Sequence, residues 1–325
     1  MKAAEIENNK LVVKNRENEK LENRKGAIVK VLGCGLCGSD IVKLKQHLVK
    51  DGTVLGHEIV AQIVEINSDT DFKSGDIIVT SHHIPCGKCE YCKNGNVSMC
   101  RHFKQTNLKP GGFSEYVFVS EEHLQNVAYI KPDNLTNDEA AFYEPLGCCI
   151  RAVKRASLPQ NSSVLVIGLG SIGIIMAQAL KSFGCNVIGC DLISSRVELL
   201  KNLGIEAFLV PDLCESIKAD AIFMTSGSDK AIPTALKYVR DGGKILVFSS
   251  TPMNTGFPNN EVYYRELTVL GSYSPSPADL KDSLFLLKNK DVKVKGLSTE
   301  YPIEQIQKAV EDTLDNKILK AYIKI

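Results

Sequence analysis

Four cysteines in one short segment restrict how this chain can fold more than any other feature of its sequence. They are separated by three, three and eight residues, at Cys86, Cys89, Cys92 and Cys100. Thiolates at this spacing fit a tetrahedral S4 zinc site, which leaves no open position on the metal. Gly87 and Gly95 supply turn residues that let the chain close around an ion. The sequence therefore predicts a structural zinc lobe over residues 86–100, and the spacing disfavours the alternative of free or disulfide-bonded cysteines in a loop.

The length and the charge of the chain limit the classes of protein to which it can belong. A chain of 325 residues is long enough for two domains. Its 39 basic and 38 acidic side chains give a formal net charge of +1, so charge favours neither nucleic acid nor a membrane as partner. No run reaches the roughly 18 apolar residues of a membrane helix, and residues 1–10 lack the apolar core of a signal peptide. Eleven cysteines, an odd number, do not form a secreted disulfide framework, and we expect a cytoplasmic protein.

The chain changes character near Asp138. Before it, short alternating patterns separated by glycine turns predict strands at 26–32, 59–66, 76–80 and 112–119, as in a small β-barrel-like domain. After it, a helical pattern at 138–155 is followed by alternating strands and helices, with strands at 164–167, 186–190, 221–225, 244–248 and 267–270 and helices at 172–183 and 194–203. This alternation predicts a doubly wound parallel sheet. Residues after 276 form a tail with helices at 278–288 and 303–314 and a strand at 320–324.

A glycine motif at the start of the second part predicts a dinucleotide site. It follows a predicted strand and opens a helix, with the motif residues Gly168, Gly170, Ile172 and Gly173. The glycines allow a tight turn, close approach of the backbone to a pyrophosphate, and close packing of helix and strand, while the helix N-terminus attracts the phosphates. Asp191 ends the next strand, where a carboxylate binds the ribose 2′-OH and favours NAD over NADP. Arg196 is a candidate for stacking on the adenine or for contacting a phosphate. A glycine turn without a nucleotide is the alternative.

A second group of residues has the chemistry of a catalytic zinc site. Cys37 and the pair His57-Glu58 offer a thiolate, an imidazole and a carboxylate, which suit a zinc ion with one open position. Glu144 is a further carboxylate. Taken singly, each of these residues has an ordinary core or surface role as its alternative. His82 and His83, just before the cysteine lobe, are interpreted as loop residues, with a position facing the cleft as the minor alternative.

Together, these motifs resemble the zinc-dependent medium-chain dehydrogenase/reductase (alcohol dehydrogenase) family, in order and over essentially the whole chain. The motifs that carry the resemblance are Cys37-Gly38-Ser39-Asp40, Gly56-His57-Glu58, the cysteine lobe, Gly111-Gly112-Phe113-Ser114-Glu115-Tyr116, Glu144-Pro145-Leu146 and the glycine motif. The Glu-Pro-Leu element is similar to the polyol branch, which includes sorbitol (L-iditol 2-) dehydrogenase. One departure is Val42, where many relatives carry a histidine of a proton relay. Proton release would then use water, Ser39 or the cofactor ribose.

The resemblance implies an α/β fold with two domains. A GroES-like β-barrel catalytic domain would comprise residues 1–144 and 276–325, with the zinc lobe at 86–100, and a doubly wound Rossmann domain would comprise residues 145–275. It also implies two zinc ions and NAD, and a homodimer or homotetramer. Cys37 and His57 would hold the catalytic zinc together with Glu58 or Glu144, and the Ser39 hydroxyl would pass on the substrate proton.

The implied reaction is oxidation of a polyol or secondary alcohol to a ketone, with hydride transfer to NAD. A threonine dehydrogenase and a phosphorylated-polyol dehydrogenase are alternatives within this class. A zinc-free reductase of the same fold and a non-catalytic protein that binds NAD and zinc are further alternatives. The motifs leave open which alcohol is the substrate, which glutamate binds zinc and in which direction the reaction runs.

Overall fold

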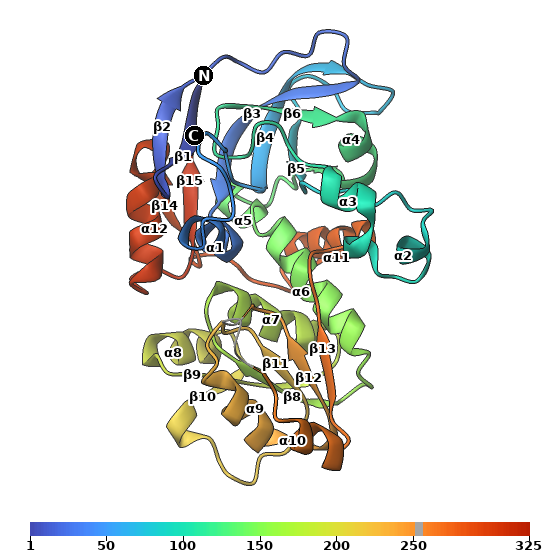
Figure 1. The fold of residues 1–325 in the computed structure, drawn as a ribbon, viewed down its shortest axis with the longest axis vertical. Helices are drawn as coiled ribbons and strands as arrows, with labels where there is room; N and C mark the ends of the chain where they lie inside the picture. The colour runs from blue at the N-terminus through green and yellow to red at the C-terminus, as the bar shows by residue number, and fades with distance from the viewer. Residues whose placement is uncertain (251–255) are drawn as a thin grey trace. The chain divides into compact units, whose positions relative to one another are not determined.

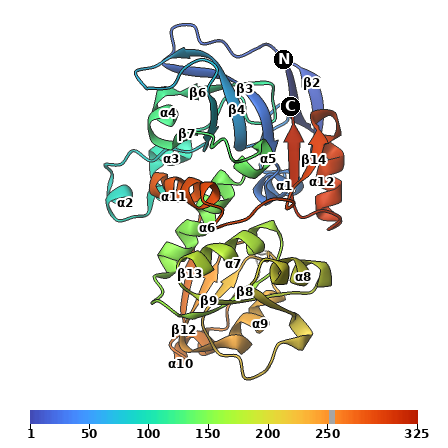
Figure 2. The same ribbon diagram turned by 180° about the vertical axis from the view of Figure 1, so that it is seen from behind.

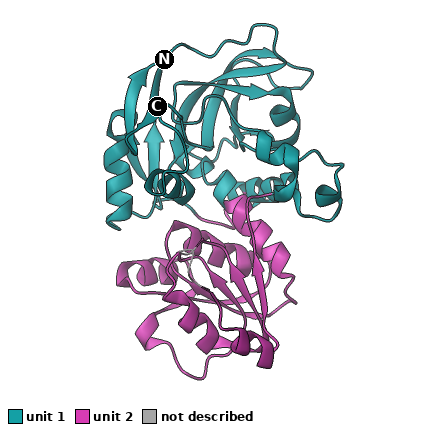
Figure 3. Ribbon diagram, in the orientation of Figure 1, with its two compact units in different colours: residues 1–145, 276–288, 294–325 teal, residues 146–275, 289–293 magenta. Residues whose placement is uncertain are grey.

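In the computed structural model, which describes residues 1–250 and 256–325, the chain forms two compact units (Figure 3). Unit 1 comprises residues 1–145, 276–288 and 294–325, and unit 2 comprises residues 146–275 and 289–293. The C-terminal tail thus belongs largely to the same unit as the N-terminus. None of the helices in the described residues combines the length and apolar character needed to span a bilayer.

Unit 1 begins with a β-hairpin that the sequence analysis did not predict. Strands β1 (Lys2–Glu7) and β2 (Lys10–Asn15) pair antiparallel across the two-residue loop Asn8-Asn9. Both asparagines have positive φ, 49° and 61°, as the central residues of a type I′ turn require. Asparagine tolerates this conformation better than most residues, so the Asn-Asn pair between two alternating segments was the available signal.

The main sheet of unit 1 joins the two ends of the chain. Its strands lie in the order β14-β15-β3-β4-β5-β7, with β6 also paired to β3 (Figure 1). The C-terminal strand β15 pairs antiparallel with β3, and β3 pairs antiparallel with β4. The strands are β3 (Gly26–Gly35), β4 (Glu58–Asn67), β5 (Ile77–Thr80), β6 (Tyr116–Ser120), β7 (Ala128–Ile130), β14 (Thr299–Pro302) and β15 (Ala321–Lys324). Their inward side chains, such as Val29, Val31, Ile59 and Ile323, form one continuous apolar core.

Short helices connect and cover these strands. They are α1 (Gly38–Lys45), α2 (Glu90–Lys93), α3 (Arg101–Gln105), α4 (Glu121–Val127), α5 (Asn137–Ala140), α11 (Pro277–Lys288) and α12 (Ile306–Leu314), with 3-10 turns η1 (Val97–Met99) and η3 (Ile303–Gln305). Helix α1 matters most for the site, because Cys37 is its N-cap. Helix α6 (Tyr143–Ala156) begins in unit 1 and continues into unit 2.

Unit 2 is a parallel sheet in the order β10-β9-β8-β11-β12-β13, which is the strand order of a dinucleotide-binding doubly wound fold. Helices α7 and α8 pack on β8, β9 and β10, while α9 packs on β8, β11 and β12 (Figure 2). The strands are β8 (Ser163–Ile167), β9 (Asn186–Asp191), β10 (Glu206–Leu209), β11 (Ala219–Met224), β12 (Val239–Val247) and β13 (Thr268–Gly271). The helices are α7 (Ser171–Ser182), α8 (Ser194–Asn202), α9 (Ala231–Tyr238) and α10 (Asn259–Tyr264), with the 3-10 turn η2 (Val210–Asp212).

Two predicted elements differ in extent from the observed ones. The strand predicted at 112–119 begins only at Tyr116. The backbone N–H groups of Gly112 and Phe113 bond to the carbonyls of the 55–56 loop, and Ser114 forms only an isolated bridge with Ala3 of β1. The helix predicted at 138–155 is divided into α5 and α6. In both cases the local residue pattern was correct, and contacts with distant loops or a local break decided the boundary.

Candidate active site and metal centres

Unit 1 brings Cys37, His57 and Glu58 together. Cys37 lies at the N-terminus of α1, and His57 and Glu58 lie at the start of β4. The Sγ atom, an imidazole nitrogen and a carboxylate oxygen of these residues all lie within 4.8 Å of one another. His57 and Glu58 are buried, with exposures of 6% and 1%, whereas Cys37 is half-buried. This donor set is suited to a zinc ion, and we refer to it below as the Cys-His-Glu group.

The Glu58 carboxylate lacks the hydrogen bonds that a buried anion normally has. Its Oε1 has no hydrogen-bond partner among the described residues. Its counter-charge is Lys320, whose Nζ lies 2.5 Å from Oε2. Burial lowers the pKa of Lys320, but the Glu58 carboxylate outweighs this effect and the pKa is raised overall. A buried carboxylate with unused lone pairs beside a thiol and an imidazole fits a cation-binding site.

The buried Asp40 carboxylate lies beside the His57 ring. Its Oδ1 lies 3.5 Å from His57 Nδ1, and its Oδ2 accepts the backbone N–H of Cys37 at 3.3 Å. Burial opposes ionisation of Asp40, but the charge of His57 lowers the pKa overall. A carboxylate on one ring nitrogen leaves the other nitrogen to face a metal. Asp40 therefore orients a candidate ligand, a role that its place in the Cys-Gly-Ser-Asp motif did not reveal.

The other two predicted catalytic residues have different positions. Glu144 is buried in the first turn of α6 with an exposure of 4%, and it is outside the Cys-His-Glu group. Its charge nevertheless contributes to the raised pKa of Lys320, after the larger effects of burial and Glu58. Ser39 is exposed in the first turn of α1, and its backbone N–H points to Cys37 Sγ at 3.5 Å. Ser39 is thus the second residue of the helix whose N-cap is Cys37.

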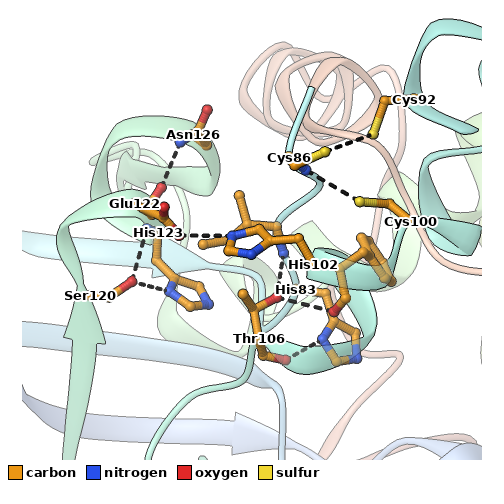
Figure 4. Close-up of polar contacts among 12 residues, drawn as sticks. His83, Cys86, Cys92, Cys100, His102, Thr106, Ser120, Glu122, His123 and Asn126 are labelled. Carbon is orange, nitrogen blue, oxygen red and sulfur yellow. Dashed lines mark hydrogen bonds and ion pairs between the residues drawn. The ribbon is translucent and has the colours of Figure 1, made fainter. Parts of the chain in front are cut away.

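The four cysteines of the lobe converge around α2, η1 and α3. Their sulfur atoms lie within 4.8 Å of one another. The Cys86–Cys92 distance is 4.0 Å (Figure 4), and the Cys89–Cys92 distance is 3.6 Å. A tetrahedral zinc ion with Zn–S bonds of about 2.3 Å separates its sulfur ligands by about 3.8 Å, so the spacing fits. Burial raises the pKa of the Cys100 thiol, but the N–H groups of Cys86 and Phe103 lower it to about 6 overall. The backbone is thus arranged to stabilise a thiolate.

A row of aromatic rings connects the lobe with the Cys-His-Glu group. The ring centroid of His57 lies 4.5 Å from that of His82, which lies 3.8 Å from His83, which in turn lies 4.7 Å from Phe103 in α3. His83 Nδ1 is 2.6 Å from the Thr106 carbonyl (Figure 4), so this nitrogen carries the proton. The two histidines that the sequence analysis interpreted as loop residues therefore lie beside a candidate metal ligand.

The glycine motif of unit 2 adopts the predicted strand–turn–helix arrangement between β8 and α7. Gly168 has φ +95°, and a Cβ on it would meet the backbone of Ser226 at 3.0 Å. A Cβ on Gly173 would collide with the Gly168 carbonyl, whereas Gly170, the N-cap of α7, faces open space. The backbone at Gly170 can therefore be approached closely by a phosphate. Ile172 is half-buried in the first turn of α7.

Asp191 lies at the end of β9, beside this turn. Its Oδ2 accepts the N–H of Leu169 at 2.5 Å, and its Oδ1 accepts the N–H of Ile193 at 2.9 Å. Arg196 Nη1 lies 3.7 Å from the same Oδ2. The carboxylate is thus fixed next to the glycine motif, as a residue that reads the ribose requires. Sequence reasoning missed Thr225, whose hydroxyl donates to the Gly168 carbonyl at 2.6 Å and holds the turn.

Comparisons with known proteins identify the family of dehydrogenases that this chain is similar to. The family model of the alcohol dehydrogenase GroES-like domain matches residues 23–129, and that of the zinc-binding dehydrogenases matches residues 171–289. The chain is 32% identical to a sorbitol dehydrogenase of Halalkalibacterium halodurans, over 91% of this chain and 90% of the relative. It is 28% identical to D-arabitol-phosphate dehydrogenase of Enterococcus avium, over 91% and 89%. Galactitol-1-phosphate dehydrogenase of Escherichia coli shares the fold, with a TM-score of 0.87, 23% identity and full coverage of both chains.

Proposed function

The chain belongs to the zinc-dependent medium-chain dehydrogenase/reductase family and is an alcohol or polyol dehydrogenase, and on this premise we propose that it oxidises a polyol or secondary alcohol to a ketone at the Cys-His-Glu group, with NAD as hydride acceptor. The observation that carries the proposal is the buried Glu58 carboxylate, which lies beside Cys37 and His57 and whose Oε1 has no hydrogen-bond partner among the described residues. The complete donor set speaks against a zinc-free reductase.

We assign the candidate residues as follows. Cys37, His57 and Glu58 hold the catalytic zinc, because their donor atoms already converge within 4.8 Å. The charge of Glu144 contributes to the raised pKa of Lys320. We assign Glu144 as an alternative zinc ligand or as a hydrogen-bond partner for a water molecule. The Cys86, Cys89, Cys92 and Cys100 thiolates hold a second, structural zinc.

The chain's own residues position the substrate and move its proton. When bound, zinc acts as a Lewis acid on the alcohol oxygen, and NAD accepts the hydride. The alcohol loses one hydride and one proton, so the products are a ketone, NADH and H⁺. The Ser39 hydroxyl takes up the proton and passes it to solvent, since Val42 cannot act as a relay. Asp40 keeps the His57 ring in a fixed orientation throughout.

The nucleotide site favours NAD. The glycine motif binds the pyrophosphate at the N-terminus of α7, and Asp191 accepts hydrogen bonds from the adenosine ribose. Arg196 is paired with Asp191 at 3.7 Å and is therefore not a free cation for a 2′-phosphate. The carboxylate also repels such a phosphate, which disfavours NADP.

We further propose a homodimer or homotetramer in the cytoplasm. Strand β13 is the last strand on one side of the unit 2 sheet, and its Val269 is 38% exposed. The neighbouring helix α10 exposes Tyr263 and Tyr264 by 75% and 79%. An open strand edge beside exposed aromatic rings is a surface that a second copy can cover. Light scattering during gel filtration measures the oligomeric state, and a monomer would contradict this part of the proposal.

Zinc content and activity together test the assignment. We expect two zinc ions per chain when the metal content is measured by inductively coupled plasma mass spectrometry. We also expect NAD-dependent oxidation of at least one polyol in a panel of polyols, sugars and threonine. Cys37→Ser should lose one zinc and the activity while the lobe keeps its zinc. A Cys37→Ser enzyme with two zinc ions and full activity would show that the Cys-His-Glu group is not the catalytic site.

A further inference from the structure

Two polar side chains near the Cys-His-Glu group, Lys43 and His82, have polar atoms without a hydrogen-bond or ion-pair partner among the residues that the structure describes. The Lys43 ammonium forms no ion pair or hydrogen bond with any residue that the structure describes, and the His82 imidazole makes no hydrogen bond within the same part of the chain. Polar groups in such half-buried places are normally satisfied by the protein or by a ligand. Their position therefore bears on what the site binds.

Lys43 lies on the same side of α1 as the proton-transferring serine. Ser39 and Lys43 are four residues apart and therefore share one helix face. Asp40, Ile41 and Leu44 occupy the buried face of this helix. Burial is the main cause that lowers the pKa of His82, and the positive charge of Lys43 lowers it further. The ammonium is therefore close to both the serine face of α1 and the histidine pair.

The charge of Lys43 contributes to the lowered pKa of Asp40, after the larger effects of burial and His57, but the close contacts of the nearby acidic groups are with other residues. Asp40 faces His57 and the Cys37 N–H. Glu58 is paired with Lys320 at 2.5 Å. Lys43 is half-buried and forms no close ion pair with the described residues, so its ammonium is available to an anionic group of a ligand.

His82 is held in place through its backbone and its neighbour. The His123 Nε2–H donates to the His82 carbonyl at 3.1 Å, and His123 Nδ1 accepts from the Ser120 hydroxyl at 2.7 Å (Figure 4). The adjacent His83 is fixed by the Thr106 carbonyl. The His82 ring is thereby fixed 4.5 Å from the His57 ring, while its buried Nδ1 remains without a partner. An imidazole fixed in this way can form a hydrogen bond with a hydroxyl group through its unpartnered nitrogen.

We propose that the substrate is an acidic polyol, a sugar alcohol that carries a phosphate ester or a carboxylate, whose anionic group binds Lys43 and one of whose hydroxyls binds His82. The inference rests on the proposed function and adds the charge of the substrate to it. Phosphate and carboxylate are both anions that accept several hydrogen bonds from an ammonium group. Which of the two is present is decided by experiment.

The test compares the zinc-loaded enzyme with two lysine variants on three substrates. The substrates are sorbitol, sorbitol 6-phosphate and gluconate. Lys43→Met removes the proposed anion contact, and Lys45→Met is the matched control, because Lys45 is an exposed lysine two residues further on a different face of α1. Both variants change the net charge equally. Affinity for NADH is measured separately by fluorescence.

We expect the unmodified enzyme to prefer one of the two acidic polyols over sorbitol by kcat/KM. Lys43→Met should reduce this preference by about 10- to 100-fold, the effect of one charge-assisted contact, whereas Lys45→Met should keep it. His82→Phe should raise KM for the acidic polyol while NADH affinity is unchanged. A preference for sorbitol 6-phosphate identifies a phosphate substrate, and a preference for gluconate identifies a carboxylate.

Three results would overturn the inference. Equal preferences in Lys43→Met and Lys45→Met, whether both reduced or both unchanged, would show that Lys43 makes no specific contact with the anionic group. Weaker NADH binding in Lys43→Met, with the same loss on every substrate, would assign Lys43 to the cofactor phosphates. Oxidation of sorbitol in preference to both acidic polyols would contradict the inference and leave the proposed function intact, whereas failure of a two-zinc enzyme to oxidise any alcohol would refute the proposed function itself.

Discussion

Replacement of Lys320 by methionine tests whether the buried ion pair stabilises unit 1. Lys320 and Glu58 have side-chain exposures of 5% and 0%, and their charges lie 2.5 Å apart. At an effective dielectric constant of about 20, this separation corresponds to a gross attraction of about 7 kcal/mol, much of which offsets the desolvation of both ions. Removing only the lysine leaves a buried, unpaired carboxylate, which costs about 3–5 kcal/mol.

We expect Lys320→Met to lower the melting temperature of the metal-free protein by roughly 6–20 °C, from about 2–4 °C per kcal/mol in a domain of this size. The loss should be smaller in the zinc-loaded enzyme, because a bound cation compensates the Glu58 charge. Glu58→Gln combined with Lys320→Met should recover much of the stability, since neither charge is then left alone. Differential scanning calorimetry of all variants, with and without zinc, measures these differences.

Lys317→Met is the control. Lys317 lies three residues earlier, its side chain is 61% exposed, and it also pairs with acidic residues. A surface pair of this kind contributes about 0–1 kcal/mol, so the control should melt close to the unmodified protein. If Lys320→Met melted within the range of Lys317→Met, the Lys320–Glu58 pair would not be a significant source of stability. An equal loss with and without zinc would argue that Glu58 is not close to the metal.

Three further predictions concern the other parts of the site. Asp191→Ala should reduce the preference for NAD over NADP, measured as the ratio of kcat/KM values, and an unchanged ratio would count against its role at the ribose. Cys100→Ser should reduce the zinc content by one ion and lower the thermal stability, whereas two ions per chain in this variant would contradict the assignment of the lobe. Gly35→Ala should cost about 1–3 kcal/mol, because the new Cβ would overlap the Glu58 carboxylate. Gly38→Ala, with nothing within 4 Å of its Cβ position, should melt like the unmodified protein; equal melting temperatures of the two alanine variants would refute the packing argument.

The parts of the molecule that could be predicted from the sequence depend on short-range patterns. The cysteines of the lobe are ligands at fixed local spacings, and a loop of fifteen residues brings them together without help from distant strands. The glycine motif is similarly local, because strand, turn and helix are consecutive. The order of these local motifs gave the resemblance to the family and predicted the fold class. The family models confirm this fold class.

The boundaries of some strands and the N-terminal hairpin were harder to predict from the sequence. The β1–β2 hairpin was missed because its strands are short and polar, and only the Asn8-Asn9 turn indicated it. The segment 112–115 has a strand-like pattern, yet its first two residues bond to the loop at 55–56 and the next two contact the N-terminal strand β1. Hydrogen bonds to distant loops leave no period in the sequence, so alternation alone could not place the start of β6.

By itself, the sequence determined the ligand types, the two-part organisation and the nucleotide motif, because each depends on neighbouring residues and on their chemistry. Only the tertiary structure decided what surrounds the ligands. Lys320 reaches Glu58 because β15 pairs with β3 and β3 pairs with β4, which aligns Tyr322, Gly35 and Glu58 across three strands. The same sheet and the loop after β5 place His82 against His57. Such neighbours are fixed by sheet register and core packing, which join residues far apart in the chain and therefore have no signature in its local order.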